Sequence, residues 1–362
     1  MNEYWSPEEI DKTGANYRVV YGERGPGKTY SFKKKAIDNF VENGKQFAYV
    51  RRNDSETKPG VLSFFFDDIN DYLQMRMKER YPQYNSFAVM PKTGSFWLYG
   101  YDENDTRQPI GAFGHYFALV NCRFKKSVPY PEVTLFCYDE FMCDESKGER
   151  ELPNEFSTLL NLISTIKRKR SDLIVYFFGN SVSRNSGILQ AMSINVRDIP
   201  QGAIKCYSYH DGALINTVAV EYCRHYEQEA ASEEFYVFGS KREMMIRDGS
   251  FEVDDYKKIE IKDGVRPLLG IVFECSTCRL YGYAMSDGTL WVRPTRWQRS
   301  VEYITLTTGE TNVRHRQFNW SFDAPKISAL ISKIYRCVDN GLVLYEDDYT
   351  GDDFRHFLHE AA

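Results

Sequence analysis

The sequence predicts an α/β protein in which a doubly wound parallel sheet is followed by a smaller α+β domain. Apolar segments at 16–21, 133–140 and 172–180 have the composition of strands that are buried on both faces. Amphipathic patterns at 31–44 and 153–170 predict helices that would cover the sheet. Later in the chain the pattern changes to short strands and hairpin turns, which indicates a second domain.

The first strand leads into a glycine-rich loop, "YGERGPGKTY" (21–30). Its G-x-x-x-x-G-K-T spacing between a strand and a helix is typical of phosphate-binding loops, because glycine lets the backbone approach an anion. The helix that follows stops at Gly44 and would direct its first N–H groups at that anion. We therefore predict bound nucleoside triphosphate rather than a chance turn. The predicted binding residues are Gly22, Glu23, Arg24, Gly25, Pro26, Gly27, Lys28, Thr29 and Tyr30.

The strand at 133–140 ends in two carboxylates, Asp139 and Glu140. The first is placed to bind Mg²⁺ and the second to polarise a water molecule for attack on the γ-phosphate. The pair favours an NTPase that hydrolyses its nucleotide over a nucleoside kinase, and the N-K-x-D signature of Ras-like GTPases is absent. Asn180 ends the next strand, where it would either contact the attacking water or close an Asx turn.

Composition excludes a disordered chain and a membrane protein. The hydrophobic share of 42% is enough for real cores, and no apolar run is long enough to span a membrane. The N-terminus has no secretory signal, and eight scattered cysteines suit reduced thiols. Cys275 and Cys278 form a lone C-x-x-C without further ligands nearby in the sequence, so we interpret them as structural.

We expect a P-loop ATPase domain over residues 1–205, a helical linker over 206–248 and a C-terminal domain over 249–362. Residues 53–130 are interpreted as an insertion that decorates the sheet. The net charge of −5 is concentrated at the end of the chain, for which we expect a solvated, frayed acidic tail. A nuclease would need several converging carboxylates, and only Glu274 stands out, so we interpret the second domain as a non-catalytic contact surface.

Five segments in order, "GERGPGKTY", "FAYVRRND", "LFCYDEF", "LPNEFSTLLNLISTIKRKR" and "GNSVS", resemble the genome-packaging ATPase of phi-29-like podophages. The resemblance implies an ASCE-type, RecA-like motor related to FtsK, HerA and terminases. It further implies a pentameric homo-oligomeric ring on the portal of a prohead, in the host cytoplasm, that drives double-stranded DNA inward. ATP and Mg²⁺ would be its cofactors. The second domain would be a vestigial RNase H-like nuclease fold, and a packaging RNA is left open as a partner.

The resemblance also assigns roles to single positions. It implies that Lys28 and Thr29 bind phosphate and Mg²⁺, that Asp139 binds Mg²⁺ and that Glu140 is the base. From the residues alone, "KRKR" (167–170) would be a solvated helix end, a DNA-backbone contact or an arginine finger for a neighbouring subunit, and the first is favoured. The resemblance implies the third, because Arg168 matches the family's trans-acting finger. Arg24 matches the arginine in the family's loop. At Asp54 the family carries a lysine, and Lys58 is a possible substitute.

A DNA motor must bind phosphates whatever the base sequence is. The candidate DNA contacts are Arg51, Arg52, Lys58, Lys125 and Lys126. Two alternatives to a packaging motor stay open at this point: a helicase or other RecA-like remodeller, and a regulatory scaffold that binds ATP without coupled work.

Overall fold

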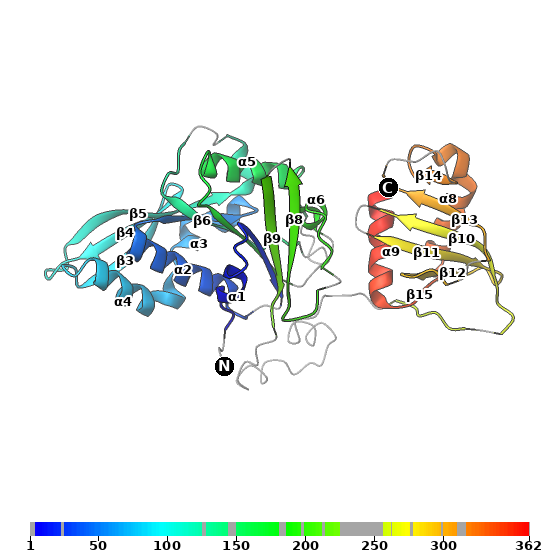
Figure 1. Ribbon diagram of the computed structural model, residues 1–362, viewed down its shortest axis with the longest axis horizontal. Coiled ribbons are helices and arrows are strands. Elements are labelled where there is room, and N and C mark those ends of the chain that lie inside the picture. Colours follow the sequence, from blue (N-terminus) through cyan, green and yellow to red (C-terminus); the bar gives the residue numbers. More distant parts are fainter. Residues whose placement is uncertain are drawn as a thin grey trace. The chain divides into compact units, whose positions relative to one another are not determined.

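The computed structural model consists of two compact units, Met1–Glu252 and Val253–Ala362, which are described separately (Figure 1). It describes residues 4–22, 25–124, 128–143, 150–180, 186–196, 199–211, 214–224, 256–261, 263–275, 278–297, 300–309 and 316–361. No helix within these ranges is long and apolar enough to cross a membrane.

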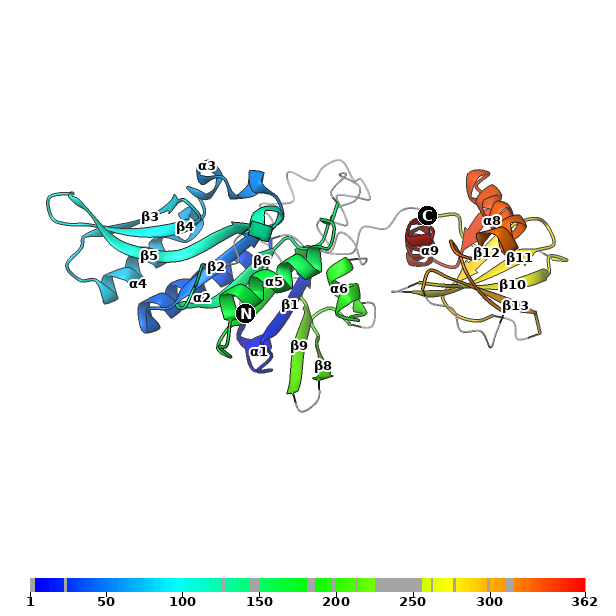
Figure 2. The same cartoon turned by 90° about the horizontal axis from the view of Figure 1, so that it is seen from above.

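The N-terminal unit is built on a nine-stranded sheet with the order β3-β4-β5-β2-β6-β7-β1-β9-β8. The six strands from β5 to β9 in this order pair in parallel, as predicted, while β3, β4 and β8 add antiparallel edges. Figure 2 shows β3 and β4 continuing the sheet beside β5, at one end of the parallel strands. The bounds are β1 Tyr17–Gly22, β2 Gln46–Arg51, β3 Ser86–Lys92, β4 Ser95–Tyr101, β5 Arg107–Ala118, β6 Val133–Asp139, β7 Ile174–Asn180, β8 Ile204–Asp211 and β9 Leu214–Tyr222.

Helices cover both faces of this sheet, α2 and α4 on one side and α5 on the other (Figure 1). Alternation along β6 explains the two layers: Leu135 and Cys137 belong to the core beneath α2 and α4, whereas Tyr138 faces α5 and bonds to Glu155. The bounds are α1 Glu8–Asp11, α2 Lys28–Asn43, α3 Pro59–Leu62, α4 Asn70–Arg80, α5 Glu155–Lys167 and α6 Gly187–Ala191, with 3₁₀ turns η1 Asp54–Thr57, η2 Asp67–Ile69 and η3 Leu119–Phe124.

The end of this unit differs from the sequence-based expectation. We expected a helical linker over 206–248, but β8 and β9 are strands, and β9 lies parallel to β1. Val218, Ala219 and Val220 are buried there, because apolar and β-branched residues pack well between neighbouring strands of a sheet. Residues 225–248 of the expected linker lie outside the described residues.

The C-terminal unit contains a six-stranded mixed sheet with the order β14-β13-β10-β11-β12-β15. The short strands expected from the sequence are present, together with two helices, and the pairs β10–β13, β12–β15 and β13–β14 are parallel. The bounds are β10 Pro267–Glu274, β11 Arg279–Met285, β12 Leu290–Arg293, β13 Tyr303–Thr307, β14 Gln317–Asn319, β15 Val343–Tyr345, α8 Ala324–Asp339 and α9 Asp348–Ala361.

The frayed acidic tail was a wrong prediction. Residues 348–361 form helix α9, and its Phe354 and Phe357 are fully buried in the core of the C-terminal unit. They pack against Phe273 of β10, and Phe357 also contacts Trp320. The helix is amphipathic: Asp352 and Glu360 keep contact with solvent, whereas Asp353 is buried beside the apolar stripe that stabilises the helix.

Candidate nucleotide-binding and hydrolysis site

The glycine loop connects β1 to α2, as the motif predicts. Gly25 and Gly27 have φ of 100° and 84°, in the left-handed region that glycine adopts without steric cost. Gly27 is also the N-cap of α2, a helix of 16 residues, so the unpaired N–H groups of its first turn face the loop. Glu23 and Arg24 lie outside the described residues. The described part of the loop therefore has the geometry of an anion-binding turn.

Lys28 and the chain's first described residues complete this turn. The Lys28 side chain is buried, and its Nζ lies 3.4 Å from the carbonyl oxygen of Gly22, at the start of the loop. On the other side, the Trp5 N–H donates to the carbonyl of Pro26 at 2.6 Å. The ring of Tyr4 lies 6.1 Å from that of Tyr30, with half of Tyr4 exposed. Nothing in the motif indicated that residues 4–5 would contact the loop.

Asp139, at the end of β6, is the candidate metal ligand. Thr29 Oγ1 and the Tyr49 hydroxyl both donate to Asp139 Oδ2, each at 3.0 Å. Burial raises the pKa of Asp139, and the nearby Arg51 guanidinium and these two hydrogen bonds oppose that shift. A hydroxyl and a carboxylate in contact are oxygen ligands of the kind that Mg²⁺ prefers, and a cation there would favour the buried carboxylate. These residues fit the ion.

Glu140 follows directly, where the chain turns out of the sheet with a left-handed φ of 55°. Its carboxylate is 45% exposed and lies 2.6 Å from Arg51 Nη2. Arg51 Nη1 also lies 3.8 Å from Asp139 Oδ2, and Arg51 Nε donates to Glu56 at 2.9 Å. Arg51, expected as a DNA contact, is thus a half-buried cation that neutralises the two acidic residues of the site. This placement contradicts the DNA-contact expectation.

Arg52 is likewise not a surface cation. Its Nε and Nη2 lie 2.9 Å and 3.1 Å from the carboxylate of Glu155, the first residue of α5. Glu155 also accepts from Tyr138 at 2.5 Å, and Arg52 Nη2 donates to the carbonyl of Phe141 at 2.5 Å. Both members of the ion pair are buried, so DNA phosphates cannot reach Arg52. Its charge fixes the turn that carries Glu140.

The other predicted residues lie in different places. Asn180 ends β7 next to Gly22 in the β1–β7 register, and is therefore beside the loop. Lys58 is exposed at the N-cap of α3, where it stays a candidate for contact with phosphate. Lys125 and Lys126 lie outside the described residues.

Arg168 is far from the chain's own loop. It is exposed at the C-cap of α5, with φ of 49° and ψ of −122°. The neighbouring Arg170 donates to the carbonyl of Val133 at 2.8 Å. Val133 is the first residue of β6 and Asp139 the last, so this end of α5 lies at the edge of the sheet opposite to Asp139. The 13 residues of α5 span about 20 Å at 1.5 Å per residue. Arg168 therefore cannot serve the nucleotide of its own chain.

A comparison with known families identifies this arrangement. The family described as Podovirus DNA encapsidation protein (Gp16) matches residues 2–86 and 111–281, more than half of the chain. The chain belongs to this family. The unmatched stretch between the two matched ranges, residues 87–110, falls on β3, β4 and the start of β5, at the edge of the sheet and away from the loop.

Individual relatives of this Gp16 family member agree with the assignment. It is 25% identical over 313 residues to the DNA packaging protein of Bacillus phage PZA, covering 85% of this chain and 84% of that one. It is 33% identical over 164 residues to that of Bacillus phage B103, covering 45% and 44%. Among solved structures, a chain of the bacteriophage Phi-29 viral genome packaging motor assembly is similar over its whole length, with TM-score 0.60 and 20% identity, which shows a shared fold.

Proposed function

We propose that this chain is an ATPase that translocates double-stranded DNA into a preformed prohead through its portal. Membership of the DNA encapsidation family supports the process. The observation that carries the chemistry is the 3.0 Å contact of Thr29 with Asp139, because it brings the phosphate loop and the carboxylate strand into one site. We assign the N-terminal unit to the ASCE, RecA-like class on the same grounds.

Each residue of the site has a role that follows from its position. Lys28 and the N–H groups of the first turn of α2 would bind the β- and γ-phosphates. Thr29 and Asp139 would hold Mg²⁺, which when bound neutralises charge on the transferred phosphoryl group. Glu140 would accept a proton from the attacking water, once that water displaces or shares the contact between its carboxylate and Arg51. Asn180, beside Gly22, would orient the same water or the γ-phosphate.

We propose that Arg168 acts on the nucleotide of a neighbouring subunit. Two observations support this: the residue is exposed at the edge opposite its own loop, and its φ of 49° is strained for a residue with a side chain. A ring of identical chains would bring each Arg168 to the next chain's loop. We expect the pentameric ring of the family, docked on the portal in the host cytoplasm, with a packaging RNA left open as a partner.

The C-terminal unit completes the proposal as a vestigial RNase H-like domain that contacts DNA, portal or RNA without cutting nucleic acid. The only carboxylate predicted for a nuclease centre, Glu274, lies 3.8 Å from Arg279. DNA affinity should be independent of sequence and should fall with salt, with a log–log slope of about −0.9 per neutralised phosphate.

The direct test is ATP turnover by the purified chain with and without double-stranded DNA. We expect turnover that DNA accelerates, and a Glu140→Gln variant that binds ATP but does not hydrolyse it, because the amide keeps the shape without the base. Lys28→Ala should lose tight ATP binding. Glu103→Gln, on an exposed turn, is the matched control and should behave as wild type.

The outcomes separate the alternatives. Turnover unaffected by DNA would contradict a translocase and favour the ATP-binding scaffold, whereas separation of DNA strands by the purified chain would favour a helicase. Wild-type turnover in Glu140→Gln would remove Glu140 from the catalytic role.

Mixed rings test the trans role of Arg168. Arg168→Ala and Glu140→Gln should each be inactive alone, since fingers of this kind are worth on the order of 10³ to 10⁵ in rate. Rings that contain both should regain some turnover where an intact arginine meets an intact base. No recovery in rings shown to be mixed would contradict the assignment.

A further inference from the structure

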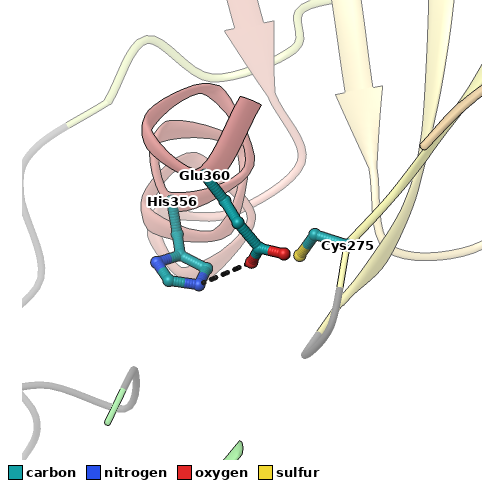
Figure 3. Close-up of side chains that lie close together, drawn as sticks. All are labelled: Cys275, His356 and Glu360. Atoms are coloured by element: carbon teal, nitrogen blue, oxygen red, sulfur yellow. Dashed lines mark ion pairs between the residues drawn. The ribbon is translucent and has the colours of Figure 1, made fainter. Parts of the chain in front are cut away.

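Three metal-ligating side chains converge in the C-terminal unit, far in sequence from the nucleotide site. Cys275 follows the end of β10, and His356 and Glu360 lie one turn apart on α9. Their ligand atoms all lie within 4.8 Å of one another. Figure 3 shows the Glu360 carboxylate between the Cys275 sulfur and the His356 ring. The i, i+4 spacing places the two helical ligands on one face of α9.

A fourth candidate ligand, Cys278, lies outside this group of three but beside one of its members. Cys278 Sγ lies 2.8 Å from Cys275 Sγ, and the Cys275 N–H donates to the carbonyl of Cys278 at 3.0 Å, which keeps the two residues together. Two thiolates on one tetrahedral Zn²⁺ lie about 3.8 Å apart, given Zn–S bonds of about 2.3 Å. Small side-chain rotations would therefore open this pair around an ion. We expected structural cysteines because no further ligands lie near them in the sequence; the other two ligands are contributed by α9.

The chemistry of the ligands selects the metal. Thiolate and imidazole favour Zn²⁺, whereas the two-metal centre of a nuclease requires oxygen ligands. Glu360 has a partner that would orient it, since Thr308 Oγ1 donates to Glu360 Oε1 at 2.7 Å. Its other oxygen lies 3.5 Å from His356 Nε2, so the imidazole and the carboxylate already face each other.

We propose that this unit binds one Zn²⁺ through Cys275, Cys278, His356 and Glu360. Binding would release the thiol protons to solvent. The ion would join α9, at the end of the chain, to the turn between β10 and β11, and so fix the helix whose phenylalanines fill the core. This site is independent of the nucleotide site and does not rest on the proposed ATPase activity.

Zinc content is the first measurement. The full-length chain is reduced, stripped with a chelator, exposed to Zn²⁺ alone, desalted and analysed by mass spectrometry for metal. We expect one zinc per chain, and Co²⁺ in its place should give a thiolate-to-cobalt charge-transfer band that reports sulfur ligation. No nucleotide is present, so an inactive ATPase would leave the result unchanged.

Variants locate the ion. Cys275→Ser and His356→Ala should each weaken zinc affinity by at least roughly 10- to 100-fold, which is what mutation of residues that only hydrogen-bond to metal ligands costs. Affinity is measured by competition with a chromogenic chelator. His359→Ala, exposed on the same helix, and Cys206→Ser, exposed on β8, are matched controls and should keep wild-type affinity. Glu360→Gln preserves the shape of the side chain, so weaker zinc binding by this variant would reflect loss of a ligand and not misfolding. We expect it to weaken binding as well.

Two results would overturn the proposal. One is a reduced wild-type chain that retains no more zinc than Cys275→Ser. This result would overturn the proposal even if the two thiols of an oxidised sample formed a disulfide. The other is equal zinc affinity in His356→Ala and His359→Ala.

Discussion

Replacing Glu155 by glutamine should destabilise the N-terminal unit strongly, although it only exchanges one carboxylate oxygen for an NH₂ group. The carboxylate lies 2.9 Å and 3.1 Å from two nitrogens of Arg52, and it also accepts from Tyr138 at 2.5 Å and from the Leu152 N–H at 2.7 Å. Side-chain exposure is only 8% for Arg52 and 2% for Glu155. Removing one member of such a pair leaves the other charge buried and unpaired, which costs about 3–5 kcal/mol. We expect the lower end, because the amide still accepts one hydrogen bond.

Glu155→Gln should also lower ATP turnover, because Arg52 supports the turn that carries Glu140. Arg52 Nη1 and Nη2 donate to the carbonyls of Glu140 and Phe141, at 3.3 Å and 2.5 Å. If Glu155 no longer orients Arg52, the left-handed turn at Glu140 loses its support. We expect lower kcat with little change in ATP affinity, since Lys28 and the loop are untouched.

The assay is urea unfolding of Glu155→Gln, Arg52→Met and the double variant. Replacing both charges removes the unpaired ion, so the double variant should be less destabilised than the sum of the singles, although the Phe141 carbonyl stays unsatisfied. Glu132→Gln, which breaks the exposed pair with Lys45 at 2.7 Å, is the matched control and should cost about 0–1 kcal/mol. If Glu155→Gln cost no more than this control, the buried pair would not support the site.

Three further predictions address other parts of the chain. Burial raises the pKa of Glu221 from 4.5 to about 7, so the folded state binds an extra proton and loses stability as the pH rises across this interval. The free energy of unfolding of Glu221→Gln, measured in urea relative to wild type, should therefore rise by about 3 kcal/mol from acid to alkaline pH. A difference that stays constant with pH would contradict the pKa shift. Gly27→Ala should destabilise the protein by about 1–2 kcal/mol, because φ is 84° and a Cβ would lie 3.2 Å from Tyr4. ATP affinity should fall as well. An unchanged midpoint of thermal unfolding would contradict this prediction, because it would show that the loop tolerates a side chain. Phe357→Ala should lower the free energy of unfolding by about 3–5 kcal/mol, against about 0.5 kcal/mol for His359→Ala on the exposed side of α9. Equal effects of the two variants would contradict the packing of α9 and favour a frayed tail.

Local pattern alone was enough to predict the elements that carry the candidate nucleotide site of the N-terminal unit. The glycine spacing, the helical pattern at 31–44 that stops at the left-handed Gly44, and the apolar strand that ends at Asp139 depend on neighbours a few residues away. Such features can be predicted from the sequence, because backbone freedom of glycine and the burial of a continuous apolar run are expressed in the residues themselves.

Tertiary structure decided which side chains meet. The order of the sheet puts β2 beside β6, and so brings Arg51 to the acidic pair and Arg52 to Glu155, although both looked like surface cations. In the C-terminal unit, the last helix brings His356 and Glu360 to Cys275. Periodicity reports whether a residue is buried, but its partners depend on strand order and helix docking, which are set by the packing of the whole unit.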